Sequence, residues 1–119
     1  PLLVAVAPSL SKGGTEGEVV GWIHASDYRQ RECYAGIGEF SVYIDESMQG
    51  KGVGSTLMQS FLPACADAGL WKVLSRIFVE NAASRALCRK HGFREVGIYE
   101  KHAQLDGVWK DVVIVERLL

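Results

Sequence analysis

The stretch EFSVYIDESMQGKGVGS, residues 39–55, carries the pattern that predicts the fold of this chain. Phe40, Val42 and Ile44 fall on one side of a predicted strand, and the residues between them fall on the other. Residues 49–54 are rich in glycine and lead directly into apolar residues at helical spacing. The stretch therefore predicts a strand and a helix joined by a turn whose backbone can approach a ligand closely.

The turn has the composition of an anion site. Gly50, Gly52 and Gly54 allow positive φ angles, and the helix predicted over residues 53–68 presents unpaired N–H groups at its positive end. Lys51 adds one positive charge. A Walker-type loop is excluded because Lys51 is followed by glycine, and the spacing does not fit the dinucleotide fingerprint. The alternative is a flexible connection without a ligand.

The rest of the chain predicts further strands and one more helix. Short apolar runs bounded by Gly, Pro or polar residues predict strands, and the Asp106-Gly107 pair is a strong hairpin signal. The predicted strands are residues 2–7, 18–25, 36–44, 73–79, 93–100 and 108–116, and the predicted helices are residues 53–68 and 81–90. This order describes one domain over residues 1–119, of the α/β (α+β) class, with helices packed on a mixed sheet.

Composition narrows the classes of protein to consider. The chain has 119 residues, 48% of them hydrophobic, and a net charge of -1, which is typical of one soluble globular domain. The balanced charge makes nucleic acid and anionic membranes unexpected partners. There is no apolar run of roughly 20 residues and no signal-peptide layout, and the three cysteines lack a pairing pattern. We therefore expect a cytoplasmic protein without a bound metal.

Several motifs resemble the GNAT superfamily of N-acetyltransferases. Gln49, Gly52 and Gly54 match its Gln/Arg-x-x-Gly-x-Gly/Ala signature, and residues 81–93 resemble its second coenzyme A segment, an Asn-led helix that ends in Gly-Phe. Residues 40–44 and 107–113 resemble the phosphinothricin acetyltransferase branch and its arsinothricin-acetylating relatives. The resemblance spans nearly the whole chain. It implies a largely antiparallel mixed sheet flanked by helices, and acetyl-CoA as cosubstrate.

The resemblance also implies where the coenzyme binds. The strand backbone would pair with pantetheine, the N–H near Val42 would stabilise the oxyanion, and the glycine turn would hold the pyrophosphate. The residues expected to bind coenzyme are Val42, Tyr43, Ile44, Gln49, Gly50, Lys51, Gly52, Val53, Gly54, Ser55, Asn81 and Ser84.

Glu39 is the candidate general base. Acetyl transfer to an amine requires a base that removes a proton from the substrate ammonium. Glu39 is the acid on the strand that leads to the glycine turn, and the resemblance places the branch's catalytic glutamate there. The alternative interpretation is a strand carboxylate paired with Arg29 or Arg31.

Residues 28–34 resemble the substrate loop of the branch. Arg29, Arg31 and Tyr34 are expected to bind the acceptor together with Glu39, because guanidinium groups bind carboxylate, phosphinate or arsinate oxygens in pairs. This predicts acetylation of the α-amino group of a small amino acid of the phosphinothricin, methionine sulfoximine or arsinothricin type. A solvated charged loop is the alternative.

Several points stay open. The acceptor could be a peptide, polyamine or aminoglycoside, or the chain could be a non-catalytic acetyl-CoA-binding module. Cys88 stands where many superfamily members have a Tyr acid, so Cys88 or water would protonate the leaving thiolate. Lys110 is given no catalytic role. Family members are longer at the N-terminus, so we expect the first strand and helices to be missing here, and the resemblance implies a homodimer.

Overall fold

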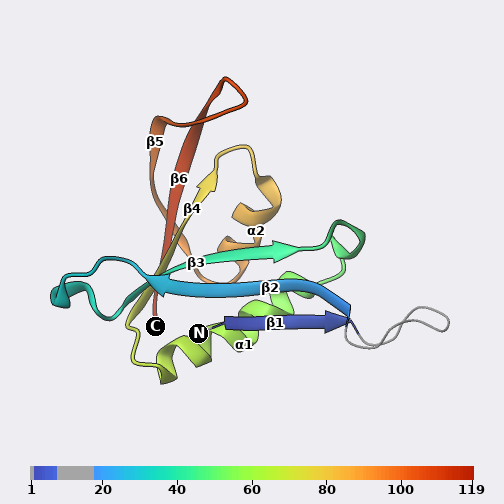
Figure 1. The fold of residues 1–119 in the computed structure, drawn as a ribbon, viewed down its shortest axis with the longest axis vertical. Coiled ribbons are helices and arrows are strands. Elements are labelled where there is room, and N and C mark those ends of the chain that lie inside the picture. Colours follow the sequence, from blue (N-terminus) through green and yellow to red (C-terminus); the bar gives the residue numbers. More distant parts are fainter. Residues whose placement is uncertain (1, 8–17) are drawn as a thin grey trace.

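The computed structural model describes residues 2–7 and 18–119, and the loop predicted over residues 9–17 lies outside them. Strands, α-helices and short 3-10 helices follow one another along the chain (Figure 1). They are β1 Leu2–Ala7, β2 Glu18–Asp27, η1 Glu32–Tyr34, β3 Ile37–Ile44, η2 Glu46–Met48, α1 Val53–Asp67, β4 Lys72–Phe78, α2 Ala82–Lys90, β5 Arg94–Leu105 and β6 Val108–Leu118. Neither described α-helix is both long and apolar enough to cross a membrane.

The described strands form one mixed sheet of six strands, in the order β1-β2-β3-β4-β6-β5. Neighbouring strands are antiparallel except β3 and β4, which run parallel. The predicted class, a largely antiparallel mixed sheet flanked by helices, is therefore confirmed. The parallel pair lies in the middle of the sheet, and the chain passes through α1 to connect its two strands, as a parallel connection requires.

The C-terminal hairpin is longer than the sequence predicts. We expected its first strand to end at residue 100, but β5 continues to Leu105 because an irregular segment interrupts the strand without ending it. Lys101 adopts a φ of 49° there, and its N–H donates to the Asp111 carboxylate of β6 at 2.9 Å. The predicted turn is present: Asp106 and Gly107 have φ angles of 52° and 78°, the left-handed pair that a two-residue hairpin needs.

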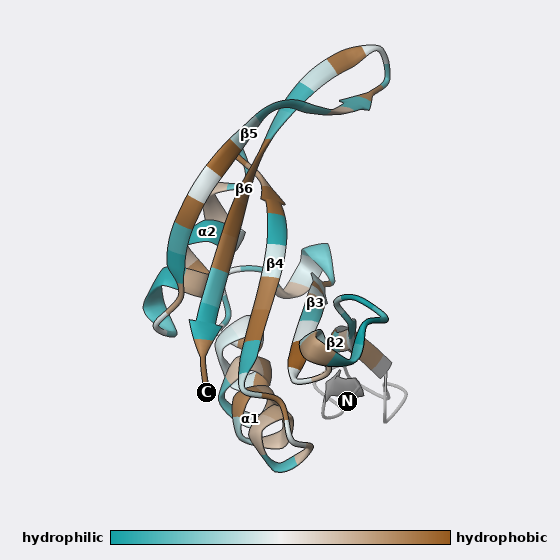
Figure 2. Ribbon diagram, turned by 90° about the vertical axis from the view of Figure 1, so that its left-hand side faces the viewer, coloured by the Kyte–Doolittle hydropathy of each residue, from teal (hydrophilic) through white to brown (hydrophobic). Residues whose placement is uncertain are grey.

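The core lies between the sheet and the two helices. The alternation along β3 is as predicted, since Phe40 is buried against the helices and Val42 and Ile44 pack against the same core. The Phe40 ring lies 5.7 Å from that of Phe61 on α1 and 5.3 Å from that of Phe93, measured between centroids. Figure 2 shows apolar residues on α1, β4 and β6, the elements that enclose this core.

Strands β3 and β4 separate soon after they meet. Their pairing covers three residue pairs, from Ile37 with Lys72 to Glu39 with Leu74. At the next step Ser75, the buried polar side chain of β4, donates its hydroxyl to the Phe40 carbonyl at 2.8 Å. The Ser75 hydroxyl of β4 thus takes the place of a backbone N–H as the hydrogen-bond donor to the Phe40 carbonyl of β3. Beyond this point the two halves of the sheet diverge (Figure 1).

Replacing Ser75 with alanine should destabilise the protein. The Phe40 carbonyl would be left buried without its hydrogen bond, which costs about 1–3 kcal/mol in the free energy of unfolding. Urea denaturation would measure this loss. Ser41→Ala is the matched control, since Ser41 is an exposed serine on the adjoining strand. Equal stability of the two variants would show that the Ser75 hydroxyl does not hold the strands at their point of separation.

Candidate functional site

The gap between β3 and β4 exposes backbone groups of β3. The carbonyl of Phe40 points into the gap, because it accepts the Ser75 hydroxyl from β4. Backbone groups of alternate residues in a strand point to the same side, so those of Val42 and Ile44 also face the gap. An extended ligand could bind this edge as an additional strand does.

The turn between β3 and α1 depends on glycine. Gly50 and Gly52 have φ angles of 76° and 81°, in the left-handed region that side chains other than glycine rarely adopt. Asp45 begins the turn by accepting hydrogen bonds from the hydroxyl and N–H of Ser47, and these bonds lower the pKa of the Asp45 carboxyl. Because Gly52 directly precedes α1 and has no side chain to cap it, the first N–H groups of α1 are available to an anion.

Helix α2 packs closely against the start of α1. A Cβ atom added to Gly54 would lie 3.1 Å from the Leu87 side chain, so glycine allows this approach. Asn81 caps α2 by accepting the N–H of Ser84 at 3.1 Å. The start of α1 therefore lies against α2, and residues of both helices border the groove beside β3.

These elements enclose a groove of about 550 Å³. It is lined by residues that the sequence predicts to bind coenzyme, namely Val42, Tyr43, Ile44, Gln49, Gly50, Gly52, Val53, Gly54, Ser55, Asn81 and Ser84. Lys51 alone of the predicted set does not line the groove. Its side chain is exposed on the turn, and its N–H donates to the Met48 carbonyl at 3.4 Å.

Sequence motifs missed part of the groove wall. Its further lining residues are Met48, Ala83, Ala86, Leu87 and Lys90. Those on α2 are three or four residues apart and so share one face of the helix, which begins near the Asn81 cap. Helical spacing from Asn81 leads to residues 84, 85 and 88 instead, so the motif that begins at Asn81 gives no signal for this face. Lys90 is a lysine of the groove wall, a position that we had expected for Lys51.

A hydrogen bond connects the two helices at the far end of α2. The Ser55 hydroxyl lies 3.0 Å from Nε2 of His91, the residue that follows α2. Burial, followed by the charges of Lys90 and Arg117, lowers the pKa of His91. The imidazole is therefore neutral at pH 7 and can accept the Ser55 hydroxyl, which lines the groove on α1.

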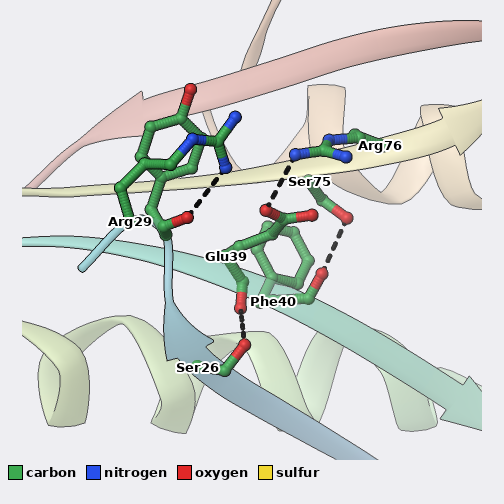
Figure 3. Close-up of polar contacts among 7 residues, drawn as sticks. Ser26, Arg29, Glu39, Phe40, Ser75 and Arg76 are labelled. Atoms are coloured by element: carbon green, nitrogen blue, oxygen red, sulfur yellow. Dashed lines mark hydrogen bonds and ion pairs between the residues drawn. The ribbon is translucent and has the colours of Figure 1, made fainter.

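Glu39 lies on the face of the sheet opposite the helices. Its Oε1 is 3.2 Å from Nη2 of Arg76 on β4, and the side chains are 28% and 38% exposed (Figure 3). The alternative interpretation, in which Arg29 or Arg31 pairs with this carboxylate, is wrong. The partner is 37 residues away in sequence and comes close only because β3 and β4 are neighbours.

A smaller pocket of about 180 Å³ lies on this face. Its lining residues are Tyr28, Arg29, Leu74, Arg76, Tyr99, His102 and Ile114, and none of them is acidic. The Arg29 guanidinium carbon is 4.1 Å from the centroid of the Tyr28 ring, and Nη1 donates to the Tyr28 carbonyl at 2.9 Å. Two guanidinium groups thus converge on one pocket, which gives it the charge to attract an anion.

The other predicted acceptor residues do not line this pocket. Arg31 is exposed and directly precedes η1. The half-buried Tyr34 packs edge-on against Tyr28, with 5.9 Å between ring centroids. The structure therefore brings Arg29 together with Arg76 and His102, two residues that the loop motif could not include because they lie on β4 and β5.

Cys88 and Lys110 line neither of these two pockets. Cys88 is 2% exposed in the core, where burial and then the charge of Glu95 raise its pKa to about 11. This is the environment of a small apolar side chain. Lys110 makes a 2.7 Å ion pair with Glu80. Within the described residues, no group of three His, Cys, Asp or Glu side chains is arranged to hold a metal.

Comparisons with known proteins agree on one family. A model of the acetyltransferase (GNAT) family matches residues 8–93. The chain is 39% identical over 103 residues to YwnH of Bacillus subtilis, named provisionally as a phosphinothricin acetyltransferase, with 87% of this chain and 63% of that protein covered. It is 33% identical over 109 residues to an L-methionine sulfoximine/L-methionine sulfone acetyltransferase of Pseudomonas aeruginosa, and this match covers 92% of this chain and 63% of that protein.

Solved structures give the same result. A GNAT superfamily phosphinothricin acetyltransferase of Sinorhizobium meliloti, in complex with acetyl-CoA, matches with a TM-score of 0.81 and 30% identity. The match covers 87% of this chain and 56% of that one. The chain thus spans less than two thirds of the length of these relatives, 63% for both curated proteins.

Proposed function

Because this chain belongs to the acetyltransferase (GNAT) family, we propose that it transfers an acetyl group from acetyl-CoA to the α-amino group of a small amino acid of the phosphinothricin, methionine sulfoximine or arsinothricin type. One observation carries the proposal. Strand β3 borders the groove through Val42 and Ile44, and on its other face it presents Glu39 beside a pocket that contains two arginines. Acetyl-CoA bound in the groove and an amino acid bound in the smaller pocket could therefore meet at strand β3.

The groove has the parts that coenzyme A requires. The unpaired N–H groups at the start of α1 would bind the pyrophosphate, and Lys90 at the groove wall would add a positive charge. The free edge of β3 at Val42 and Ile44 would bind the amide-containing pantetheine arm as a strand binds its neighbour. The acetyl-CoA complex of the Sinorhizobium relative supports acetyl-CoA as the cosubstrate.

Acetyl-CoA would supply an activated acetyl thioester, and residues of this chain would direct the transfer. Glu39 takes a proton from the substrate ammonium, and the neutral amine forms a bond to the thioester carbon as the carbon–sulfur bond breaks. The N–H of Val42 faces the gap and donates to the carbonyl oxygen as negative charge develops there. The nitrogen gives up its second proton as the amide forms, and since Cys88 lies in the core, we assign to water the transfer of this proton to the leaving thiolate.

The acceptor would bind through its acidic groups. Arg29 lines the pocket and is held in place by Tyr28, and Arg31 and Tyr34 belong to the same segment before β3. Planar guanidinium groups bind carboxylate and phosphinate oxygens in pairs, which favours amino acids with a second acidic group. The Bacillus relative, whose name gives phosphinothricin, supports an acceptor with a second acidic group, and the Pseudomonas relative, whose name gives methionine sulfoximine and methionine sulfone, supports a small amino acid with a polar side chain.

The proposed coenzyme site predicts the effect of Gly52→Val. Valine is strained at a φ of 81°, so the turn would change shape and lose its anion site. In the wild type, acetyl-CoA at 100 times its Kd should stabilise the fold by about 2.7 kcal/mol, measured as a thermal shift. The shift should be largely absent in Gly52→Val and retained in Gly97→Val, which changes a glycine of β5 with free space around it. A normal shift in Gly52→Val would place the coenzyme elsewhere.

The role of Glu39 as base predicts the kinetics of Glu39→Gln. This variant keeps the shape and removes the basicity, so kcat should fall by about 10²- to 10⁴-fold while acetyl-CoA affinity stays nearly unchanged. The deficit should narrow at higher pH, where more of the amine is already deprotonated. Thiol release from acetyl-CoA with phosphinothricin measures the rate. A near-normal kcat with chemistry rate-limiting would refute the role, and a loss of thermal stability that matches the loss of rate would indicate structural pairing instead.

We further propose that the protein acts in the cytoplasm as a homodimer. Its cysteines are unpaired, as a reducing compartment favours. The β5–β6 hairpin contains hydrophobic segments along both strands (Figure 2). Its large apolar side chains Ile98, Val108 and Trp109 are each more than half exposed. Such surfaces favour contact with another protein. Sedimentation of the whole protein should give twice the chain mass, and Trp109→Glu should shift it toward the monomer. A wild-type monomer at micromolar concentration would contradict the proposal.

A further inference from the structure

We propose that Arg76 selects the acceptor by exchanging partners: it leaves Glu39 for the second acidic group of an anionic acceptor, and the released Glu39 then acts on the amine. This inference rests on the proposed function and deepens it, because it names the residue that links acceptor charge to the base. Arg76 would be a specificity-determining residue that contacts the acceptor.

Arg76 belongs to two sites at once. Its Nη2 bonds the Glu39 carboxylate at 3.2 Å, and the same side chain lines the pocket that also contains Arg29 and His102. Figure 3 shows Arg29 and Arg76 on the same side of β3 as the Glu39 carboxylate. An anion that enters the pocket therefore comes within reach of the guanidinium that neutralises Glu39.

The ion pair is suited to exchange. Both side chains are partly exposed, at 28% and 38%, and one hydrogen bond is described between them where a guanidinium fork could make two. Exposed pairs of this kind contribute little stability, so a better-placed anion can replace the Glu39 carboxylate. Arg29 differs, because its stacking on Tyr28 and its bond to the Tyr28 carbonyl hold it in place. The pocket thus combines one anchored guanidinium with one that can move.

The pocket is built for an acidic group on a short chain. Leu74 and Ile114 give it an apolar wall, and the rings of Tyr99 and His102 lie in contact, tilted by 30° with 4.6 Å between their centroids. Its volume of about 180 Å³ suits part of a small amino acid. An acceptor without a second acidic group offers Arg76 no anion beyond its α-carboxylate, so Arg76 keeps its hydrogen bond to the Glu39 carboxylate and leaves that carboxylate less free to contact the amine. Acidic acceptors should therefore have a higher kcat and a lower KM than acceptors without a second acidic group.

Binding of an anion without an amine tests the exchange directly. The probe is the deamino analogue of phosphinothricin, titrated by calorimetry into the full-length protein with coenzyme A present. Arg76→Gln should weaken binding by about 10- to 100-fold, as expected for the loss of a charged hydrogen bond. Glu39→Gln should tighten binding by up to about fivefold, because Arg76 no longer has a competing partner. In the double variant the Glu39 substitution should have no effect.

Acceptor preference gives the second measurement. The ratio of kcat/KM for phosphinothricin over methionine should fall about tenfold or more in Arg76→Gln. Arg76→Lys, which keeps the charge, should recover part of the ratio. Arg94→Gln is the matched control: Arg94 on β5 also pairs with a glutamate, Glu116, at 2.7 Å, but lies outside the pocket. This control should keep the wild-type ratio.

The outcomes separate the exchange from the proposed function. If Glu39→Gln leaves the affinity for the analogue unchanged or weakens it, or if Arg76→Gln lowers kcat/KM equally for both acceptors, the exchange is overturned. If the binding pattern is found but no amino acid is acetylated, the exchange stands and the proposed function fails. If acetylation is found without the binding pattern, the proposed function stands and the exchange fails.

Discussion

The architecture of this protein depends on the point where β3 and β4 separate. The two strands pair over three residues and are then joined by the Ser75 hydroxyl at the Phe40 carbonyl. A longer pairing would close the sheet and cover the backbone of Val42 and Ile44. The early separation keeps that edge free while the Phe40 ring remains packed in the core. One buried hydrogen bond thus lets a continuous sheet contain the candidate coenzyme groove.

Strand β3 borders both the groove and the Glu39–Arg76 pair, because its side chains alternate between the two faces of the sheet. The residues that point to the helices anchor the strand in the core, and their backbone groups border the groove. The residues between them point to the opposite face, where Glu39 meets Arg76. The period of two therefore places a candidate base and a candidate coenzyme edge within a few residues of each other, on a strand that the core holds rigid.

Much of the fold was predictable because its signals are local. The alternation of β3, the glycine turn, the Asn81 cap and the Asp106-Gly107 hairpin turn each depend on residues that are neighbours in the chain. Element ends were less predictable. The length of β5 depends on a contact between Lys101 and Asp111, which lie on different strands. A pattern of neighbouring residues therefore does not predict where β5 ends.

The sequence by itself determined the glycine turn, the helix that follows it and the position of Glu39 on the preceding strand. Backbone dihedral preferences and side-chain periodicity settle such features over a few residues. Only the tertiary structure decided which arginine meets Glu39, which lysine lines the groove and which residues join Arg29 in the smaller pocket. These choices depend on strand order and helix packing, which bring together side chains that lie far apart in the chain, and charge attraction alone does not distinguish one arginine from another.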